Sequence, residues 1–243
     1  MKPESNFGFF CLALPVDKPF KMKKYVLIVA GGKGRRMEAG QPKQFIEIGG
    51  LPLLMHTFHA FSSADTKFEF VLVLPADLIA QWKELCNIHH FNIPHQIAES
   101  GPKRFHSVKS GLKLVPENAW VAIHDAARPF VSRKVITDCF ALAERKGNAI
   151  PVIPVGDSVR ETNGIFNKGV NRNKLRLVQT PQVFSSSSIK LAYQQTYNES
   201  FTDDASVLEN TGQAIYLVDG NPENIKITRP IDLLTAQSLI DLI

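Results

Sequence analysis

The most constraining feature of this sequence is an apolar strand that runs directly into a glycine-rich loop. Residues 25–30 form an unbroken apolar run with several β-branched side chains, which is typical of a strand buried on both faces of a parallel sheet. Gly31, Gly32 and Gly34 follow at once. Without Cβ atoms, this backbone can approach a ligand and point its N–H groups at phosphate oxygens. The stretch therefore predicts a buried strand that ends in a phosphate-binding loop.

Four cations stand close to these glycines: Lys33, Arg35, Arg36 and Lys43. A triphosphate needs such charges nearby as negative charge redistributes during transfer. The spacing fits neither a P-loop nor a dinucleotide fingerprint, which needs a small residue where Met37 stands. The remaining pattern, Gly-Gly-x-Gly-x-Arg-Met followed by Pro-Lys, resembles the loop with which nucleotidyltransferases hold a nucleoside triphosphate. The alternative is an ordinary strand-to-helix turn with solvated cations.

Length and composition favour one α/β domain that acts on a small anion. The 243 residues fit a single large domain, or one domain with an excursion. The net charge is +5, but the basic residues are spread among carboxylates, and no basic helix or RNA-binding aromatic pattern accompanies them. We therefore expect no nucleic-acid partner. The three cysteines lack the spacing of disulfide or zinc sites, which favours a reducing cytoplasm.

The first 21 residues differ from the rest of the chain. Residues 7–14 are apolar, but the run is too short to span a membrane, and no small-residue cleavage site follows it. We therefore expect no membrane association. We expect residues 1–21 to be an extension that is not native, with Met22 as the natural start and residues 22–243 as the nucleotidyltransferase domain.

Strand and helix patterns alternate along most of the chain. Strands are expected at residues 68–74, 94–98, 120–123, 148–155, 182–184, 214–218 and 225–228, with helices at 52–62, 77–87, 105–114, 133–146, 186–197, 204–210 and from 229 onward. Pro151 and Pro154 indicate that their strand is an edge strand or is bent. The alternation predicts a doubly wound, mostly parallel sheet with the site at the carboxyl ends of its strands.

Residues 156–178 interrupt this alternation. Asn163-Gly164 lies between two short polar strand patterns, which indicates a β-hairpin with a type I′ turn. A polar two-stranded arm is marginal alone in water. We therefore predict a protruding β-hairpin arm that packs against a second subunit to form a homodimer. The alternative is a hairpin folded back on its own domain.

Taken together, the loops at the predicted strand ends resemble one family over residues 22–243. Four motifs carry the resemblance beyond the glycine loop: His124-Asp125-Ala126-Ala127-Arg128-Pro129, Gln179-Thr180-Pro181-Gln182, Thr202-Asp203-Asp204-Ala205-Ser206 and Lys226-Ile227-Thr228-Arg229-Pro230. They are similar to those of the 2-C-methyl-D-erythritol 4-phosphate cytidylyltransferases of the non-mevalonate isoprenoid pathway. The resemblance implies a Rossmann-like domain with a dimerising arm, transfer of CMP from CTP to a polyol monophosphate, and Mg²⁺ or another divalent cation.

The resemblance also implies roles for particular residues. The catalytic group would be Arg36, Lys43, Arg172 and Lys226, the first two stabilising the transition state and the last two holding the substrate phosphate. The nucleotide would lie against Ala30, Gly31, Gly32, Gly34, Gly101 and Ser107. The acceptor would meet Asp125, Arg128, Ser158 and Thr180, and the metal ligands are unknown. If the arm is exchanged, Arg172 would serve the partner's active site.

Two departures from the family pattern and several alternatives remain. Lys33 stands where relatives often carry a small or apolar residue, and residues 99–103 differ from the usual glycine-rich, acidic version, although Arg104 and Ser107 remain in place. A ribitol-5-phosphate cytidylyltransferase differs only in its acceptor, and a non-catalytic nucleotide-binding regulator would keep the same fold. The failed fingerprint disfavours an NAD(P)-dependent dehydrogenase. Asp125 has its own alternatives, a helix cap or a structural ion pair with Arg128.

Overall fold

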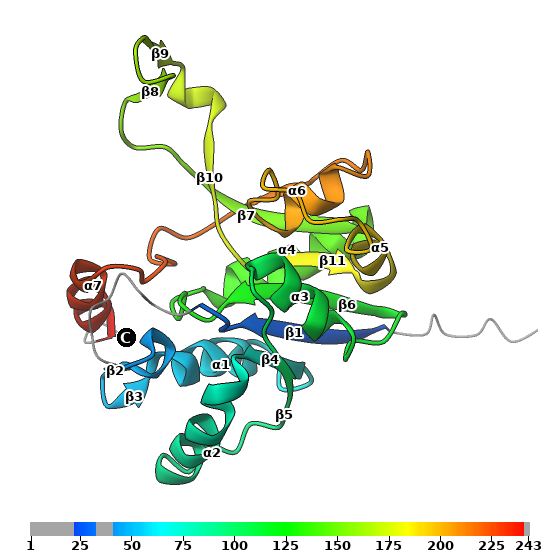
Figure 1. Cartoon of the computed structure of the whole chain (residues 1–243), viewed down its shortest axis with the longest axis vertical. Coiled ribbons are helices and arrows are strands. Elements are labelled where there is room, and N and C mark those ends of the chain that lie inside the picture. Colours follow the sequence, from blue (N-terminus) through cyan, green and yellow to red (C-terminus); the bar gives the residue numbers. More distant parts are fainter. Residues whose placement is uncertain (1–21, 33–40, 241–243) are drawn as a thin grey trace, which may run out of the picture.

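Strand β1 lies in the interior of the sheet, between β4 and β6, as its apolar run predicts. The computed structural model describes residues 22–32 and 41–240 (Figure 1). Four neighbouring strands run parallel in the order β5 (His95–Glu99), β4 (Glu69–Leu74), β1 (Lys23–Val29) and β6 (Ala119–Asp125). Val26, Leu27 and Ile28 of β1 have no exposed surface. Burial on both faces explains why the run is continuous instead of alternating with polar residues.

The sheet becomes mixed beyond β6. The strands there are β7 (Asn148–Pro154), β10 (Arg176–Val178), β11 (Gln182–Ser185) and β12 (Leu217–Asp219). β11 is antiparallel to both β6 and β7, and β7 also pairs with β10 and, in parallel, with β12. The largely parallel sheet is confirmed, with this antiparallel insertion.

Of the two alternatives predicted for β7, the edge strand is wrong, because β7 pairs with three strands, while the bent strand stays a prediction. The bonds to the β12 side fall on the residues that flank Pro151: Ile150 donates to Tyr216 and Val152 accepts from Gly220. Pro151 itself uses only its carbonyl, which accepts from Gln179 at 2.9 Å. Because the flanking residues and the Pro151 carbonyl make these bonds, none of them needs an N–H on Pro151.

Helices cover both faces of the sheet, which confirms the doubly wound architecture. One face packs against α1 (Leu53–Ala64), α2 (Ile79–Ile88) and α4 (Arg133–Lys146), and the other against α3 (Arg104–Leu112), α5 (Ser186–Ala192) and α6 (Asp204–Glu209). Alternate residues of β1 divide between the two cores, Val26 and Ile28 in one and Tyr25 and Leu27 in the other. No helix of the described ranges is long and apolar enough to cross a membrane.

A third, smaller core closes the sheet end where the cavity lies. This core contains side chains of β2 (Glu47–Ile48), the start of α1 and α7 (Pro230–Ile240). The neighbouring η1 (Lys43–Phe45) and β3 (Leu51–Pro52) pack instead with the core that α1 covers. η2 (Ala76–Leu78) lies between β4 and α2. The predicted start of α7 is confirmed, since Thr228 and Arg229 both donate their backbone N–H to the Asp232 carboxylate at 2.8 Å. The predicted strand at residues 225–228 is wrong: Ile227 donates one backbone bond to Ala127, and its side chain fills this core.

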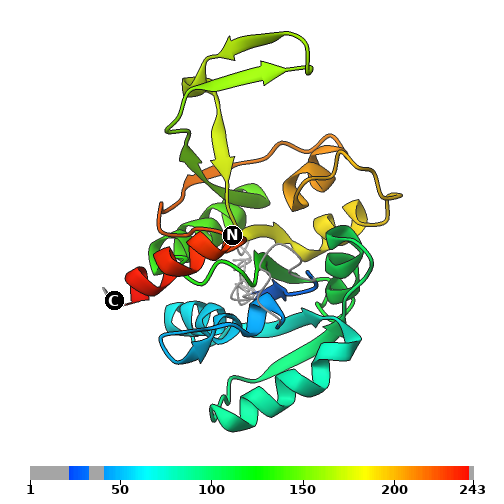
Figure 2. The ribbon, with the colours of Figure 1, turned by 60° about the vertical axis from the view of Figure 1, so that its left-hand side comes forward.

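The arm projects from the body of the molecule in both views (Figures 1 and 2). It contains β8 (Val159–Thr162), β9 (Asn167–Val170) and η3 (Arg172–Lys174). The hairpin is confirmed, but the type I′ turn is wrong, because of its loop residues only Gly164 has a positive φ, at 92°. The loop spans residues 163–166, and the Asn163 side chain accepts from the backbone N–H of Ile165 and Phe166. This side-chain bonding replaces the backbone geometry of a two-residue turn.

Candidate active site

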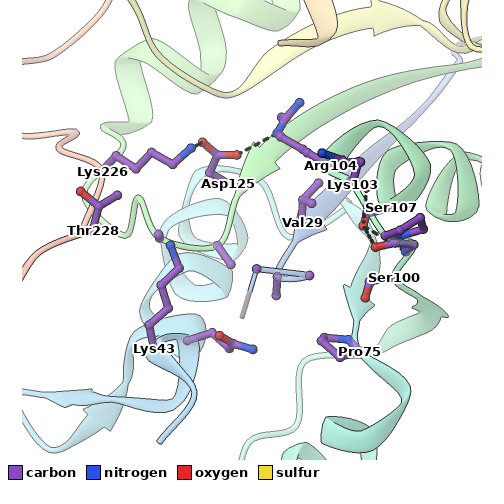
Figure 3. A pocket seen from close by; sticks show the side chains of 18 residues that line it. Val29, Lys43, Pro75, Ser100, Lys103, Arg104, Ser107, Asp125, Lys226 and Thr228 are labelled. Atoms are coloured by element: carbon purple, nitrogen blue, oxygen red, sulfur yellow. Dashed lines mark hydrogen bonds and ion pairs between the residues drawn. The ribbon is translucent and has the colours of Figure 1, made fainter. Parts of the chain in front are cut away.

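A cavity of about 740 Å³ opens at the carboxyl ends of β1 and β6 (Figure 3). Parallel strands present the end of each strand at one edge of the sheet, so loops distant in sequence meet there. Predicted site residues that line the cavity are Ala30, Gly31, Gly32, Lys43, Gly101, Ser107, Asp125 and Lys226. Gly34 and Arg36 lie outside the described residues.

Glycines allow two loops of the cavity wall to lie against each other. A Cβ atom on Gly31 would stand 2.8 Å from Ser100 Cβ and 2.9 Å from Ser107 Oγ. A Cβ atom on Gly101 would stand 2.4 Å from His106 Cβ. The Ser107 hydroxyl then accepts from the Gly101 N–H at 3.1 Å. The predicted nucleotide-binding residues of these two loops therefore form one continuous wall.

Asp125, the last residue of β6, carries a carboxylate that cations surround. Lys226 Nζ lies 2.8 Å from Oδ2, Arg104 Nε lies 3.2 Å from Oδ1, and Arg128 Nε lies 3.6 Å from Oδ2. Figure 3 shows Lys226 and Arg104 reaching the carboxylate from opposite sides. Burial by itself would raise the pKa of Asp125, but these cations hold it well below its usual range. Asp125 is therefore ionised at any physiological pH.

A chain of hydrogen bonds supports Asp125 from behind. Thr180 Oγ1 accepts from the Asp125 backbone N–H at 3.1 Å and lies 3.0 Å from His124 Nδ1. His124 Nε2 lies 2.9 Å from the Arg128 carbonyl oxygen. These partners assign a neutral ring with its proton on Nε2, so that Thr180 donates to Nδ1. Burial lowers the pKa of His124 to about 4. Thr180, which the resemblance places at the acceptor substrate, is buried. Its hydrogen bonds join the start of β11 to the end of β6.

Arg128 belongs to the support of the cavity wall. Its Nη1 donates to the Asn224 carbonyl at 2.7 Å, and Asn224 donates in turn to the Thr180 carbonyl at 2.8 Å. Arg128 is not among the described residues that line the cavity. The ion pair between Asp125 and Arg128, which the sequence left open as an alternative, is present.

Ser158 and Arg172 lie on the arm and are exposed. Arg172 donates to the Gly156 carbonyl, and neither residue is among the described lining of the cavity. The structure therefore does not bring these two predicted residues to the cavity of their own chain.

Arg104 is the residue whose importance the sequence understates. Its position in the sequence indicates only a part of the cytosine-reading loop, yet it bonds Asp125 with Nε and Asp204 with both terminal nitrogens. Burial would lower the pKa of Arg104, but the two carboxylates hold it well above its usual range. The one advance signal is the Asp203-Asp204 pair in a motif that carries the family resemblance, to which the sequence assigns no role.

A cation at this site would need ligands from the substrate. Asp125 is the one carboxylate among the described lining residues, and the described residues hold no group of three or more His, Cys, Asp or Glu side chains that could bind a metal. One carboxylate together with phosphate oxygens and water is a usual environment for Mg²⁺. The donor set fits a divalent cation that arrives on a triphosphate.

Comparisons with known proteins agree over nearly the whole chain. The family model for 2-C-methyl-D-erythritol 4-phosphate cytidylyltransferase matches residues 24–241. The protein of that name from Phocaeicola vulgatus is 50% identical over 219 residues, covering 90% of this chain and 100% of that protein. The one from Bacteroides fragilis is 51% identical over the same length.

A solved structure extends the agreement to the fold. The crystal structure of 2-C-methyl-D-erythritol 4-phosphate cytidylyltransferase from Thermus thermophilus superimposes with a TM-score of 0.72 and 30% identity. The match covers 88% of this chain and 98% of that one. The chain therefore belongs to the 2-C-methyl-D-erythritol 4-phosphate cytidylyltransferase family.

Proposed function

We propose that this protein transfers CMP from CTP to 2-C-methyl-D-erythritol 4-phosphate in isoprenoid precursor biosynthesis. The products are 4-diphosphocytidyl-2-C-methyl-D-erythritol and pyrophosphate. The observation that carries the proposal is the cavity at the carboxyl ends of β1 and β6, where a glycine wall and Lys43 share the lining with Asp125 and its partners Arg104 and Lys226. Family membership over residues 24–241 supports the same reaction.

The chemistry needs fixed positive charge more than a reactive side chain. An acceptor phosphate oxygen forms a bond to the α-phosphorus of CTP, while the bond from that phosphorus to the pyrophosphate oxygen breaks. Negative charge then grows on the pyrophosphate and the non-bridging oxygens. Lys43 lines the cavity beside Gly32, and we assign it to stabilise this charge together with Arg36. Backbone N–H groups of Gly31 and Gly32 suit the phosphates of CTP.

The acceptor side of the cavity is assigned to Asp125 and Lys226. Lys226 is 42% exposed and can turn toward a phosphate, while Asp125 can accept hydrogen bonds from polyol hydroxyls. That Thr180 and Arg128 contact the acceptor substrate stays a prediction. Their observed bonds support a role in orienting Asp125. Magnesium or another divalent cation would neutralise charge on the bound triphosphate, with Asp125 as its protein ligand.

The arm supports a proposed homodimer. Ile165 and Phe166 at its tip are 83% and 75% exposed, and Leu177 of β10 is 51% exposed. Exposed apolar side chains at the tip of a projecting hairpin favour a protein partner. A second copy of this chain would cover them and would receive Ser158 and Arg172 at its own cavity. We further expect a cytoplasmic enzyme without a nucleic-acid or membrane partner, as predicted from the sequence.

The direct test is pyrophosphate release with CTP and magnesium in the presence of methylerythritol phosphate, ribitol 5-phosphate or no acceptor. The proposal predicts strong preference for methylerythritol phosphate and a product of the mass of its cytidine diphosphate derivative. Preference for ribitol 5-phosphate, or CTP binding without pyrophosphate release, would contradict it. The comparisons favour neither of those alternatives.

A further inference from the structure

One motif found in the sequence has no part in the function described so far. It is Thr202-Asp203-Asp204-Ala205-Ser206, at the start of α6. Asp204 has no exposed surface and is not among the described residues that line the cavity. A fully buried carboxylate is costly unless charge and hydrogen bonds compensate it. Its partners therefore indicate what it does.

Those partners tie α6 to the cavity through Arg104. Nη1 of Arg104 donates to Asp204 Oδ1 at 2.8 Å and Nη2 donates to Oδ2 at 2.7 Å, across 100 positions of sequence. The third nitrogen, Nε, donates to Asp125 Oδ1 at 3.2 Å. Because the guanidinium group is planar, fixing its two terminal nitrogens also fixes the direction of Nε. Asp204 thus sets how Arg104 meets Asp125.

Tyr193 holds the carboxylate of Asp204 in turn. Its hydroxyl donates to Asp204 Oδ1 at 2.6 Å, and its ring stacks on Phe105 with centroids 4.7 Å apart. Phe105 follows Arg104 in α3, so the ring stack and the ion pair both hold the same turn of this helix in place. Asp204 therefore has a single orientation, fixed by Tyr193 and by α3.

The neighbouring carboxylate has a different task. Asp203 accepts from the Ser206 backbone N–H at 2.9 Å as the cap of α6, and from Gln182 Nε2 at 2.8 Å. Neither bond involves Arg104. Two adjacent carboxylates in one motif thus separate into a helix cap and a buried ion-pair partner, and this separation supplies a matched control.

We propose that Asp204 is a positioning residue for the reaction, holding Arg104 so that the Asp125 carboxylate keeps its orientation toward the acceptor. The proposal rests on the proposed function, in which Asp125 meets the acceptor. Asp204 touches neither substrate, and its influence passes through Arg104. Its loss leaves Arg104 free to turn, and Asp125 then keeps Lys226 and Arg128 but loses its third fixed partner.

The experiment compares Asp204→Asn with Asp203→Asn, two substitutions that each remove one charge without changing side-chain size. Pyrophosphate release gives kcat and KM for each substrate, and thermal unfolding gives the midpoint of each variant. Asp204→Asn is expected to lower kcat/KM for the acceptor about 10–100-fold, the usual range for residues that orient a direct ligand. The change should lie mainly in a raised KM for the acceptor, with KM for CTP less changed. Asp203→Asn should keep the wild-type constants.

Two further variants keep the test decisive. Tyr193→Phe removes only the hydroxyl that bonds Asp204 and leaves the ring stack, so a smaller rise in the same KM is expected even if Asp204→Asn does not fold. In an Arg104→Ala background, Asp204→Asn should have no further effect on the acceptor KM, because its route of action is gone.

Opposite results would overturn the inference. Folded Asp204→Asn and Tyr193→Phe proteins that melt lower but keep the wild-type acceptor constants would show a merely structural role. An undiminished effect of Asp204→Asn in the Arg104→Ala background would also overturn it. A wild-type protein that releases no pyrophosphate with the acceptor would instead contradict the proposed function, and the inference with it.

Discussion

The three cations around Asp125 determine the chemistry that its carboxylate can perform. Because Lys226, Arg104 and Arg128 keep the pKa of Asp125 well below its usual range, the carboxylate cannot donate a proton. It can accept hydrogen bonds or bind a cation. Together with Lys43, the cluster has an excess of positive charge, which suits a triphosphate and a phosphate monoester. The cluster therefore supports the proposal that this site stabilises a transition state by fixed charge.

The first prediction at this scale concerns Lys43. Lys43→Ala should raise the activation free energy by about 2.7–4 kcal/mol, as loss of a fixed oxyanion donor does, while KM for the acceptor stays close to normal. Arg36→Ala is expected to act similarly. Steady-state pyrophosphate release measures the effect, and Lys83→Ala, an exposed lysine of α2, is the matched control. Near-normal kcat in a folded Lys43→Ala protein would refute the assignment.

His124 predicts a pH dependence of stability. Its pKa is about 4 in the folded protein against an ordinary value of 6.5, so the unfolded chain binds the proton more readily between these values. The free energy of unfolding should therefore fall as pH decreases from about 6.5 to 4, by about 3 kcal/mol from this residue. The physical cause is burial, which disfavours the charged ring. A proton on Nδ1 would also remove the hydrogen bond that Thr180 donates to this nitrogen.

Urea unfolding at a series of pH values measures this dependence. His124→Gln removes the titrating group, so its stability should fall less steeply over the same pH range, whatever its stability at neutral pH. Burial also lowers the pKa of His95, so some dependence should remain in the variant. Equal slopes for the wild type and His124→Gln would contradict the neutral, buried state of His124.

At the scale of elements, the loop after β1 and the loop after β5 fit together only through glycine. Gly31→Ala places a Cβ 2.8 Å from Ser100 and should cost about 1–3 kcal/mol of stability, the usual effect of overpacking. Gly32→Ala is a matched control, since among the described residues its Cβ would meet only Lys43 Cε at 3.9 Å. The difference in the free energy of unfolding checks the prediction, and equal values for the two variants would show that the loops do not pack as described.

Elements set by local interactions could be predicted from the sequence. The apolar run predicts β1 correctly, and α4 begins and ends as expected because Ser132 Oγ accepts from Val135 N–H at 3.2 Å and Gly147 has a φ of 93°. The place of Asp125 and Lys226 at the cavity could be predicted because both stand in motifs that carry the family resemblance. In each case, the residues that carry the signal lie within a few positions of one another in the sequence.

Features set by distant pairing could not be predicted. The interior position of β7 depends on β10, β11 and β12, which supply its partners in spite of two prolines. The Arg104–Asp204 pair joins positions 100 residues apart, and no local pattern distinguishes Asp204 from Asp203. Likewise, the apolar alternation at 225–228 serves a small core under α7 and not a sheet.

At the scale of the whole molecule, the projecting arm is the feature that one chain alone leaves unexplained. Neither its exposed apolar tip nor its Arg172 is among the described residues that line the chain's own cavity. A dimer would bury the tip and place Arg172 at a second cavity. The proposed enzyme would then have two active sites, each built from two chains.

This arrangement predicts a dimer that depends on the arm. Light scattering should give twice the chain mass for the wild type, and Ile165→Ser combined with Phe166→Ser should shift the equilibrium toward monomer and lower turnover. Leu191→Ser, at a residue of α5 that is 62% exposed and lies off the arm, is the matched control and should stay dimeric. A wild-type monomer, or a dimer that the arm variant does not weaken, would contradict the arm's role.

We propose that CMP transfer takes place in the cavity around Asp125. Its most direct test is the turnover of Asp125→Asn with CTP, magnesium and methylerythritol phosphate, beside Asp138→Asn on the outer surface of α4 as a control of equal charge change. A folded Asp125→Asn protein should lose at least about 100-fold in kcat/KM, as is typical of removing a key polar group from an active site, and the control should lose none. Wild-type turnover in Asp125→Asn would contradict it.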